Sequence, residues 1–441
     1  MNITIIGTGY VGLTSGTCFA EVGHHVTCVD NNPEKIETLL KGEIPIYEPG
    51  LAELVQQNVA AGRLKFTTST AEGVRNGDII FIAVPTPPQA DGSVDLSFIE
   101  KVAREIAQCL TPELGYRVIV DKSTVPVKTG DKVEQTVRRY APEGVDFGVV
   151  SNPEFLREGC AVDDLLNPDR IVIGSNDERA LGYMHKLYEP FVAPVLVTDI
   201  NSAELIKHAA NSFLALKISY INAVANICEA AGADVEKVAE GIGMDKRIGR
   251  QFLNAGLGYG GSCFPKDIKA FINISETLGQ PFGLLKEVER INADQADRFL
   301  NMIREKLWVF REKKIALWGL AFKQNTDDVR ESVAITIAQK MLDEGASIVA
   351  TDPQGIPTAK RFSNLTGDIT FTEDMYAALD GADALIIATE WPQFAAADLS
   401  EVAKRLRTPL VFDGRNLLDP EDIKAAKLEY HSIGRPSVTS A

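Results

Sequence analysis

One short stretch near the start of the chain, Gly7-Thr8-Gly9-Tyr10-Val11-Gly12, constrains the fold more than any other feature. It closes an apolar run, Asn2–Gly7, that predicts a β-strand, and it opens a helical stretch. A second predicted strand, His25–Asp30, ends in an acidic residue 18 positions beyond Gly12. Glycines at these spacings, between a strand and a helix and followed by such an acid, are typical of dinucleotide-binding βαβ units. We therefore expect this unit at the N-terminus.

Each residue of the glycine motif has a separate predicted role. Gly7 permits the tight turn, Gly9 lets a pyrophosphate approach the backbone, and Gly12 allows the helix to pack closely on the strand. The helix N-terminus supplies N–H groups and a positive dipole end for the phosphates. Asp30 can bind a ribose diol and would repel a 2′-phosphate, so the predicted cofactor is NAD and not NADP.

Short apolar runs alternate with helical stretches in two parts of the chain, which predicts two parallel sheets covered by helices. The predicted fold class is α/β, with two doubly wound Rossmann-like domains joined by a long central helix and a helical region. The predicted domains cover residues 1–200, 201–310 and 311–441. The expected strands are Asn2–Gly7, His25–Asp30, Leu64–Thr68, Asp78–Val84, Arg117–Lys122 and Asp146–Val150, then Lys314–Gly319, Ser347–Asp352, Ala384–Thr389 and Leu410–Phe412.

The central helix is predicted over Ser202–Ala231. Asn201, with Glu204 three residues later, resembles an N-terminal capping pair, and Gly232 is a natural stop. On this helix Lys207 and Asn211 are four residues apart and share a face, where they can stabilise an oxyanion. The alternative for a helical lysine is an ordinary solvated position.

The composition excludes several classes of function. Asp and Glu total 61 against 45 Lys and Arg, and the resulting net charge of −16 repels nucleic acid and anionic membranes. No apolar run is long enough to span a bilayer, and the N-terminus lacks the basic segment of a signal peptide. The six cysteines form no Cys-x-x-Cys pair, and the five histidines are not spaced like metal ligands. We expect a cytoplasmic protein without a metal site.

The most informative segment is the octet Gly260-Gly261-Ser262-Cys263-Phe264-Pro265-Lys266-Asp267. Pro265 suits the first position of a helix, Asp267 suits its first turn, and Cys263 then lies just before the helix. A helix N-terminus and a neighbouring lysine favour the reactive thiolate. Most free cysteines are buried and inert, but two preceding glycines and a polar helix start suit a core poorly. We predict that Cys263 is a nucleophile.

A reactive cysteine beside a nicotinamide cofactor indicates a particular chemistry. Oxidation of an alcohol to an aldehyde needs only a hydride acceptor and a base. Oxidation of the aldehyde to an acid needs a tetrahedral adduct that can expel a second hydride, and a thiolate supplies it as a thiohemiacetal. The resulting thioester is then hydrolysed. The sequence thus predicts oxidation of an alcohol to a carboxylate, with two NAD consumed.

Polar or proline-marked turns follow several predicted strands, at Val84–Pro88, Lys122–Pro126 and Ser151–Glu154. Because the carboxyl ends of parallel strands share one rim, these turns are expected to face ligands. In the last third, the run ending at Gly319 lacks the second and third glycines of a dinucleotide motif. Candidate contacts of this domain with a nucleotide ligand are Phe322, Lys323, Arg330 and Arg415, although each alone is more often an ordinary surface residue.

Taken together, these segments resemble the successive motifs of the UDP-glucose/GDP-mannose dehydrogenases, over nearly the whole chain. The resemblance is carried by Gly7–Gly12, Val84–Pro88, Asn152–Glu158, Ala203–Asn211, Gly260–Asp267, Gly319–Lys323 and Phe412–Arg415. The family implies an N-terminal NAD domain, a central helical dimerisation region, and a C-terminal domain for the nucleotide sugar. A homodimer or a higher homo-oligomer is therefore expected.

The resemblance also implies roles for individual residues. Cys263 is the expected nucleophile, Lys207 and Asn211 stabilise oxyanions, Asp267 and Thr124 position water, and Glu154 assists proton transfer. The expected cofactor contacts are Gly7, Gly9, Tyr10, Val11, Gly12, Asp30, Lys35, Thr86, Thr124, Glu158 and Arg330. The expected substrate contacts are Glu154, Phe155, Leu156, Arg157, Glu158, Lys207, Asn211, Arg247, Phe252, Gly260, Phe322, Lys323 and Arg415, of which Arg247 matches an arginine that reaches a neighbouring subunit's substrate. Asn254 departs from the charged residue common at its position.

Two residues of the octet bear on the choice of sugar. Phe264 resembles the UDP-glucose branch, whereas the GDP-mannose branch tends to carry Leu there. Ser262 stands where dehydrogenases of N-acetylated sugars typically have His. The expected reaction is oxidation of UDP-glucose to UDP-glucuronate, with GDP-mannose or another nucleotide sugar as the alternative substrate. A non-catalytic sensor of NAD and nucleotide sugar is a further alternative.

Overall fold

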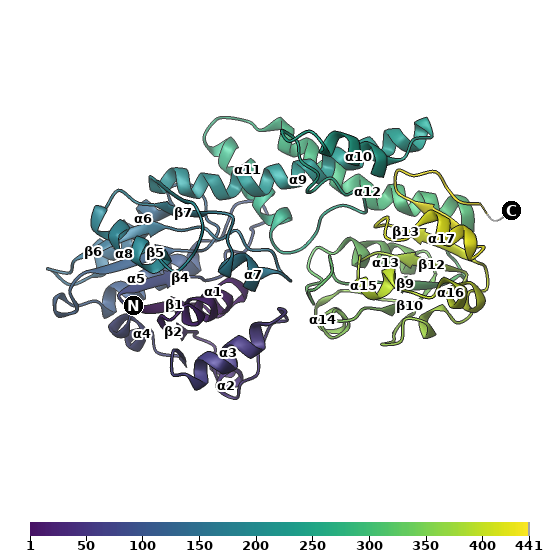
Figure 1. Ribbon diagram of the computed structural model, residues 1–441. Helices are drawn as coiled ribbons and strands as arrows, with labels where there is room; N and C mark the ends of the chain where they lie inside the picture. The colour runs from purple at the N-terminus through teal and green to yellow at the C-terminus, as the bar shows by residue number, and fades with distance from the viewer. Residues whose placement is uncertain (440–441) are drawn as a thin grey trace. The chain divides into compact units, whose positions relative to one another are not determined.

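The structure is a computed structural model that describes residues 1–439. The chain forms two compact units. Unit 1 comprises Met1–Ala210 and Lys269–Gln280, and unit 2 comprises Asn211–Ile268 and Pro281–Ala441. Each contains one sheet flanked by helices (Figure 1). This arrangement confirms the predicted α/β class with two Rossmann-like sheets and a long helix between them in the sequence. The predicted division into three domains stays a prediction.

The strands of unit 1 form one eight-stranded sheet in the order β3-β2-β1-β4-β5-β6-β7-β8. All neighbours pair in parallel except β6 and β7, which meet in antiparallel fashion at Ser151 and Gly174. The six strands expected here are present within two residues of their predicted ends, whereas β7 and β8 were not predicted. The strands are β1 (Asn2–Ile6), β2 (His25–Val29), β3 (Leu64–Thr67), β4 (Ile79–Ile82), β5 (Arg117–Asp121), β6 (Phe147–Ser151), β7 (Ile171–Gly174) and β8 (Val195–Thr198).

Helices connect these strands, and several begin at a capping side chain. Asn32, Ser69 and Asp177 accept hydrogen bonds from the first-turn N–H groups of α2, α4 and α8. Apolar clusters on the two faces of the sheet form the core of the unit. The helices are α1 (Tyr10–Glu21), α2 (Pro33–Leu40), α3 (Leu51–Ala60), α4 (Thr70–Asn76), α5 (Ser97–Cys109), α6 (Thr129–Tyr140), α7 (Ala161–Leu166) and α8 (Glu178–Tyr188), with a 3-10 turn η1 (Pro112–Leu114).

The central helix α9 covers Ile200–Ala231, and Gly232 follows it with a φ of +70°. The predicted end is confirmed, but the predicted capping pair is wrong. Asp199, not Asn201, accepts a 2.9 Å hydrogen bond from the Ser202 N–H, because the helix begins earlier than predicted. The Glu204 carboxylate accepts 2.7 Å hydrogen bonds from the N–H groups of Lys128 and Gly130 instead. It thus caps the start of α6, more than 70 residues earlier in the sequence.

Burial raises the pKa of Glu204 from 4.5 to about 7, against the hydrogen bonds that it accepts. The pKa of Glu204 is higher in the folded protein than in the unfolded chain, so protonation of Glu204 favours the folded state. This contribution to the free energy of unfolding is complete below about pH 4.5 and is lost as the pH rises through about 7. We expect the wild-type protein to lose roughly 3 kcal/mol relative to Glu204→Gln between these pH values. Denaturant unfolding of both proteins across this range measures the difference, with Glu134→Gln on the exposed face of α6 as the control. A constant difference between wild type and Glu204→Gln would contradict the prediction.

Within the described part of unit 2, the strands form a six-stranded parallel sheet in the order β11-β10-β9-β12-β13-β14. The four expected strands are present, whereas β11 and β14 were not predicted. The strands are β9 (Lys314–Trp318), β10 (Ser347–Thr351), β11 (Ile369–Phe371), β12 (Ala384–Ile387), β13 (Leu410–Asp413) and β14 (Glu429–Ser432). The further helices are α10 (Val235–Gly243), α11 (Phe264–Thr277), α12 (Gly283–Leu307), α13 (Val333–Asp343), α14 (Ile356–Phe362), α15 (Pro392–Ala395), α16 (Leu399–Arg405) and α17 (Pro420–Ala425), with a 3-10 turn η2 (Ala377–Leu379).

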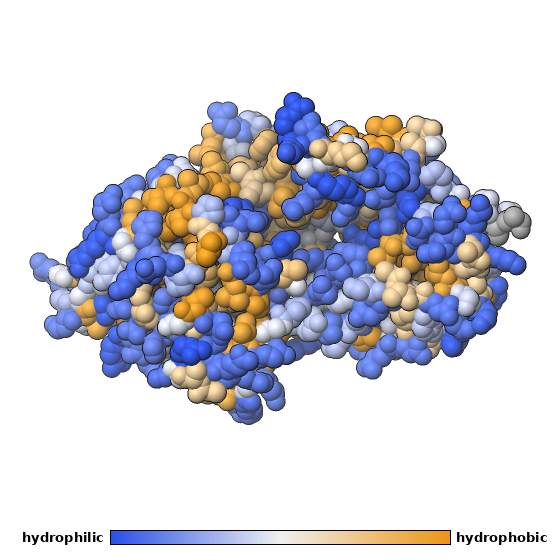
Figure 2. Space-filling view, viewed as in Figure 1, coloured by the Kyte–Doolittle hydropathy of each residue, from blue (hydrophilic) through white to orange (hydrophobic). Residues whose placement is uncertain are grey.

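Some large apolar side chains remain exposed on both units, and Figure 2 shows hydrophobic areas among hydrophilic ones on the face in view. Three residues of β8, Val195, Leu196 and Val197, are each at least 39% exposed. On α9, Phe213, Tyr220 and Ile227 recur every seven residues and are exposed by 54% or more. No helix among residues 1–439 is long and apolar enough to cross a membrane. The oligomeric state stays a prediction.

Candidate active site

The glycine motif of unit 1 has the backbone geometry that its predicted roles require. Gly7 has a φ of +105°, and a Cβ there would lie 2.4 Å from the carbonyl oxygen of Ala83 on the neighbouring strand connection. A Cβ at Gly12 would lie 1.9 Å from the Gly7 carbonyl oxygen, so α1 packs against the turn too closely for any side chain. At Gly9, the residue before α1, a Cβ would meet nothing within 4 Å. The open side at Gly9, above the start of α1, is where a pyrophosphate can approach the helix N–H groups.

Asp30, at the end of β2, is held in place by the same turn. Its carboxylate accepts hydrogen bonds from the Thr8 N–H (2.9 Å), the Thr8 hydroxyl (2.7 Å) and the Asn32 N–H (3.0 Å). Lys35 Nζ lies 3.5 Å away. Burial alone would raise the pKa of Asp30, but these hydrogen bonds and Lys35 outweigh it, and the pKa is lowered. Asp30 therefore carries a fixed negative charge beside the glycine turn, as recognition of a ribose diol requires.

The turns that follow β4 and β5 are joined to each other. The Ser123 hydroxyl donates a 2.8 Å hydrogen bond to the Val84 carbonyl, so the turn containing Thr124 is fixed against the turn containing Thr86. Thr86 is buried and Thr124 is half-buried. His208 on α9 lies 2.8 Å from the Val125 carbonyl through its Nε2 atom. The two predicted threonines thus lie on turns that contact each other at one rim of the sheet.

A buried ion pair links the turn after β6 to α9. Lys207 Nζ lies 3.0 Å from Glu154 Oε1, and both side chains are at least 93% buried. Glu154 Oε2 accepts a 2.6 Å hydrogen bond from the Leu156 N–H. The Phe155 ring lies 5.4 Å from Lys207 Nζ and 3.9 Å from the Arg170 guanidinium carbon. Lys207 is therefore not on a solvated helix face, and a buried lysine paired with a carboxylate is typical of a functional position.

The remaining predicted residues of this segment lie next to α7. Arg157 forms a 2.6 Å ion pair with Asp164 and is more than half exposed, while Glu158 is half-buried. The Gly159 N–H donates a 2.8 Å hydrogen bond to the hydroxyl of Tyr10, at the start of α1. Val11 is partly buried in the same turn of α1. The structure therefore connects segment 154–159 to the first turn of α1, where the cofactor is predicted to bind.

In unit 2, α11 begins at Phe264 and Cys263 directly precedes it. The Cys263 carbonyl accepts the 2.8 Å hydrogen bond that closes the first turn, from the Asp267 N–H. Cys263 is half-buried, and its Sγ lies 3.6 Å from the Ser262 hydroxyl. The predicted position of the cysteine before a helix is confirmed. Pro265 is the second residue of that helix and not the first, because Phe264 is already helical.

A neighbouring loop lies so close to the two glycines before Cys263 that neither position has room for a side chain. A Cβ at Gly260 would lie 2.2 Å from the Glu331 carbonyl oxygen. Gly261 has a φ of +82°, and a Cβ there would lie 2.7 Å from the Phe322 ring. The Gly261 N–H donates a 3.1 Å hydrogen bond to the Arg330 carbonyl. The loop between β9 and α13 is therefore packed directly on the segment that carries the cysteine.

Asp267 connects the cysteine helix to α9 within unit 2. Its Oδ2 accepts a 2.6 Å hydrogen bond from Asn211 Nδ2, and its Oδ1 lies 2.6 Å from Lys266 Nζ. The Asp267 side chain is 2% exposed. Two of the predicted catalytic residues, Asn211 and Asp267, are thus in direct contact, one turn beyond Cys263.

Some predicted substrate contacts lie together in unit 2. Arg415 donates hydrogen bonds to the carbonyls of Ala388 (2.9 Å), Phe322 (3.1 Å) and Gly258 (3.2 Å). The Lys323 ammonium lies 5.5 Å from the Phe322 ring. Gly260, Phe322, Lys323 and Arg415 therefore belong to one contact network beside Cys263.

The other three predicted residues of this unit have different settings. Phe252 has a φ of +64°, and its ring centroid lies 6.4 Å from that of Phe264, the residue after the cysteine. Arg247 is highly exposed and pairs with Asp245 at 2.6 Å. Arg330 is more than half exposed and pairs with Asp328 at 2.7 Å. The side chain of Arg247 therefore lies in solvent, whereas Arg330 belongs to the loop that packs on the cysteine segment.

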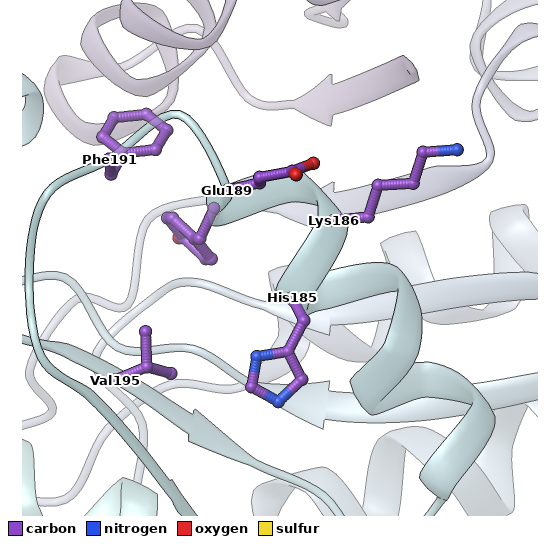
Figure 3. A pocket seen from close by; sticks show the side chains of 6 residues that line it. His185, Lys186, Glu189, Phe191 and Val195 are labelled. Carbon is purple, nitrogen blue, oxygen red and sulfur yellow. The ribbon is translucent and has the colours of Figure 1, made fainter.

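Two cavities are found in the described part of the chain, one in each unit. One of about 470 Å³ lies on α8 and the connection to β8, and Figure 3 shows the side chains around it. Its lining consists of His185, Lys186, Tyr188, Glu189, Phe191 and Val195, none of them predicted site residues. Another, of about 340 Å³ in unit 2, includes Arg330 and Phe362.

One residue near the Glu154–Lys207 pair was not predicted. Lys122, at the end of β5, is 4% exposed, and its Nζ donates a 3.0 Å hydrogen bond to Asn152 Oδ1. The only signal in the sequence is a lysine placed directly after a buried strand, in a turn that was expected to face ligands.

The chain matches three successive sequence profiles of one family. Residues 1–192 match the UDP-glucose/GDP-mannose dehydrogenase family, NAD binding domain, and residues 201–294 match the central domain of that family. Residues 316–420 match its UDP binding domain. The NAD cofactor that was expected from Gly7–Gly12 and Asp30 agrees with the first profile.

Individual relatives match the chain over nearly its whole length. A UDP-glucose 6-dehydrogenase of Bacillus subtilis (strain 168) is 48% identical over 436 residues, which is 99% of this chain and 94% of the relative. One of Rhizobium meliloti (strain 1021) is 47% identical, covering 99% and 100% of the two chains. The solved structure of a UDP-glucose dehydrogenase from Pyrobaculum islandicum is 42% identical, with a TM-score of 0.91 over 99% of this chain and 98% of that one. The chain therefore belongs to the UDP-glucose/GDP-mannose dehydrogenase family of NAD-dependent nucleotide-sugar dehydrogenases, as the sequence motifs predicted.

Proposed function

We propose that this protein oxidises UDP-glucose to UDP-glucuronate in four electrons, with two NAD and a covalent intermediate on Cys263. The observation that carries the four-electron chemistry is the half-buried Cys263 at the start of α11, one turn before the Asp267–Asn211 pair. The choice of sugar is supported by the names of relatives that are 42–48% identical over nearly the full chain. Phe264 and Ser262 favour the same branch.

The first oxidation converts the primary alcohol of the sugar to an aldehyde. NAD held by the glycine turn and Asp30 would accept the hydride from the alcohol carbon, and the hydroxyl proton leaves for a base. Glu154 is the proposed group that assists this proton transfer. Its carboxylate is held by Lys207 and by the Leu156 N–H, so its position is fixed before substrate binds.

The second oxidation needs the cysteine. The Cys263 thiolate adds to the aldehyde carbon, and the negative charge that develops on oxygen is proposed to be stabilised by Lys207 and Asn211. A second NAD held by the glycine turn and Asp30 would accept the hydride that this thiohemiacetal loses as it becomes a thioester. Water, proposed to be positioned by Asp267 and Thr124, attacks the thioester and releases the carboxylate and the thiol. Asp267 accepts a hydrogen bond from Asn211, so a change in the position of either side chain would affect both the proposed water and the proposed oxyanion contact.

The nucleotide part of the substrate is proposed to bind unit 2, which matches the UDP binding domain profile. Phe322 and Lys323 supply an aromatic face and a cation, and Arg415 fixes the Phe322 backbone. With a net charge of −16 over the whole chain, such local cations are needed to bind a diphosphate. Phe252, Gly260 and Arg247 are proposed as further substrate contacts, and Lys35, Glu158 and Arg330 as contacts near the cofactor.

The test is steady-state NADH formation with UDP-glucose, GDP-mannose and an N-acetylated UDP-hexosamine, each with NAD and with NADP. We expect turnover with UDP-glucose, two NADH for each UDP-glucuronate, and far weaker activity with NADP because Asp30 repels a 2′-phosphate. Turnover with another sugar but not with UDP-glucose would contradict the proposed substrate. Binding of NAD and nucleotide sugar without any NADH formation would instead indicate a sensor.

A further inference from the structure

A lysine with neutral hydrogen-bond partners is buried against Asn152, two residues before the proposed proton-transfer residue Glu154. Lys122 follows β5 and is 4% exposed. Its ammonium donates a 3.0 Å hydrogen bond to Asn152 Oδ1 and lies 3.5 Å from the Tyr188 hydroxyl. Within residues 1–439, no carboxylate lies within salt-bridge distance of it. Burial of an ammonium without a direct counter-ion is costly, so a lysine at such a position calls for an explanation beyond packing.

Asn152 links this lysine to the turn that carries Glu154. Its Oδ1 accepts hydrogen bonds from Lys122 and from the Tyr188 hydroxyl, the latter at 2.5 Å. Its Nδ2 donates a 2.7 Å hydrogen bond to the Val172 carbonyl, and its backbone N–H donates a 2.9 Å hydrogen bond to the Asp121 carbonyl. Both ends of the side-chain amide are therefore fixed, two residues before Glu154. The lysine thus contributes directly to the geometry of the turn that presents the carboxylate.

The charge of Lys122 also acts on the ion pair. Burial lowers the pKa of Lys122 to about 8, while attraction to Glu154 raises it and repulsion from Lys207 lowers it. Electrostatic interactions are reciprocal. The Lys122 ammonium therefore favours the charged form of Glu154 and disfavours the charged form of Lys207. The buried group consists of two cations and one carboxylate, with Tyr188 as the other titratable side chain in contact with Lys122.

We propose that Lys122 is a positioning residue for the oxidation: its ammonium holds Asn152 and the Glu154 turn, and its charge tunes proton transfer at the Glu154–Lys207 pair. This inference rests on the proposed function, because it assumes that the pair takes part in the reaction. Lys122 forms its hydrogen bond with Asn152 and is not proposed to touch substrate.

The test compares Lys122→Met with Tyr188→Phe, which also removes a hydrogen bond to Asn152 but leaves the charge. We expect Lys122→Met to lower kcat roughly 10- to 100-fold, because Glu154 is less well placed for proton transfer, while KM changes little. Removing a buried positive charge raises the pKa of both Glu154 and Lys207, so the direction of the change is the same whichever of the two controls kcat. The kcat–pH profile should therefore move to higher pH by about one unit. Tyr188→Phe should keep the wild-type profile.

A second variant, Lys122→Gln, covers the case in which the methionine variant fails to fold. Glutamine can still donate to Asn152, so it removes the charge and keeps the hydrogen bond, and it should show the same displacement of the pH profile. A wild-type pH profile in a folded Lys122 variant, with kcat no lower than in Tyr188→Phe, would overturn the proposal. The comparison uses whichever nucleotide sugar the wild-type enzyme oxidises, so failure with UDP-glucose refutes the proposed substrate and leaves this test intact.

Discussion

Replacing Cys263 by serine should reduce formation of UDP-glucuronate by at least about 1,000-fold, because no other group of the proposed site can form the adduct that expels the second hydride. A serine hydroxyl at the start of α11 has nearly the same place, but it is a much weaker acid than a thiol and stays un-ionised at neutral pH. The first oxidation does not need the cysteine, so release or trapping of the aldehyde is expected. Product analysis by mass spectrometry, beside NADH formation, separates the two steps.

Cys160→Ser is the matched control for this experiment. Like Cys263, Cys160 lies directly before a helix, in this case α7, and it is exposed. It has no part in the proposed mechanism, so the variant should keep wild-type turnover. Undiminished acid formation by Cys263→Ser would show that this cysteine is not the nucleophile. The proposed substrate would still stand, because UDP-glucose would still be oxidised.

The sequence predicted the parts of the fold whose signal is local. Strands β1, β2, β4, β5, β9 and β12 are mostly buried apolar runs, and the pattern indicates them within two residues of their ends. Strands β7 and β8 were missed although Ile171–Gly174 and Val195–Thr198 are also short apolar runs, because four apolar residues alone do not distinguish a strand from other structure. Strands β11 and β14 are short and mixed in polarity, and only pairing with their neighbours makes them strands.

The candidate site shows the same limit. The position of Cys263 before a helix and the close packing at Gly12 were predictable, because proline, glycine and a polar first turn are local signals. The roles of Glu204 and Lys122 were not, because each depends on partners distant in the sequence. Glu204 caps a helix that starts more than 70 residues earlier, and Lys122 is covered by Tyr188 from α8, 66 residues later. A single sequence does not show which side chain covers a strand end.

Replacing Gly12 by alanine should strongly weaken NAD binding and destabilise unit 1. The new Cβ would lie 1.9 Å from the Gly7 carbonyl oxygen, so either α1 or the turn must move. Such overpacking typically costs about 1–3 kcal/mol, and here it also displaces the N–H groups that are proposed to bind the pyrophosphate. We expect an NAD affinity at least about 100-fold weaker by titration calorimetry. The temperature of thermal unfolding should fall by several degrees, roughly as that loss of stability implies.

Gly9→Ala distinguishes a lost binding surface from a damaged fold. Gly9 has a φ of −74°, which alanine adopts freely, and its Cβ would enter open space. The unfolding temperature should therefore stay close to that of the wild type, because substitutions of this kind change stability by about 0.5 kcal/mol or less. If the pyrophosphate occupies that space, the added methyl group excludes it, and NAD affinity should fall roughly 10-fold or more with the fold intact. Normal NAD binding by Gly9→Ala would mean that the cofactor does not approach the backbone at this glycine, and the weak binding of Gly12→Ala would then reflect only a distorted unit 1.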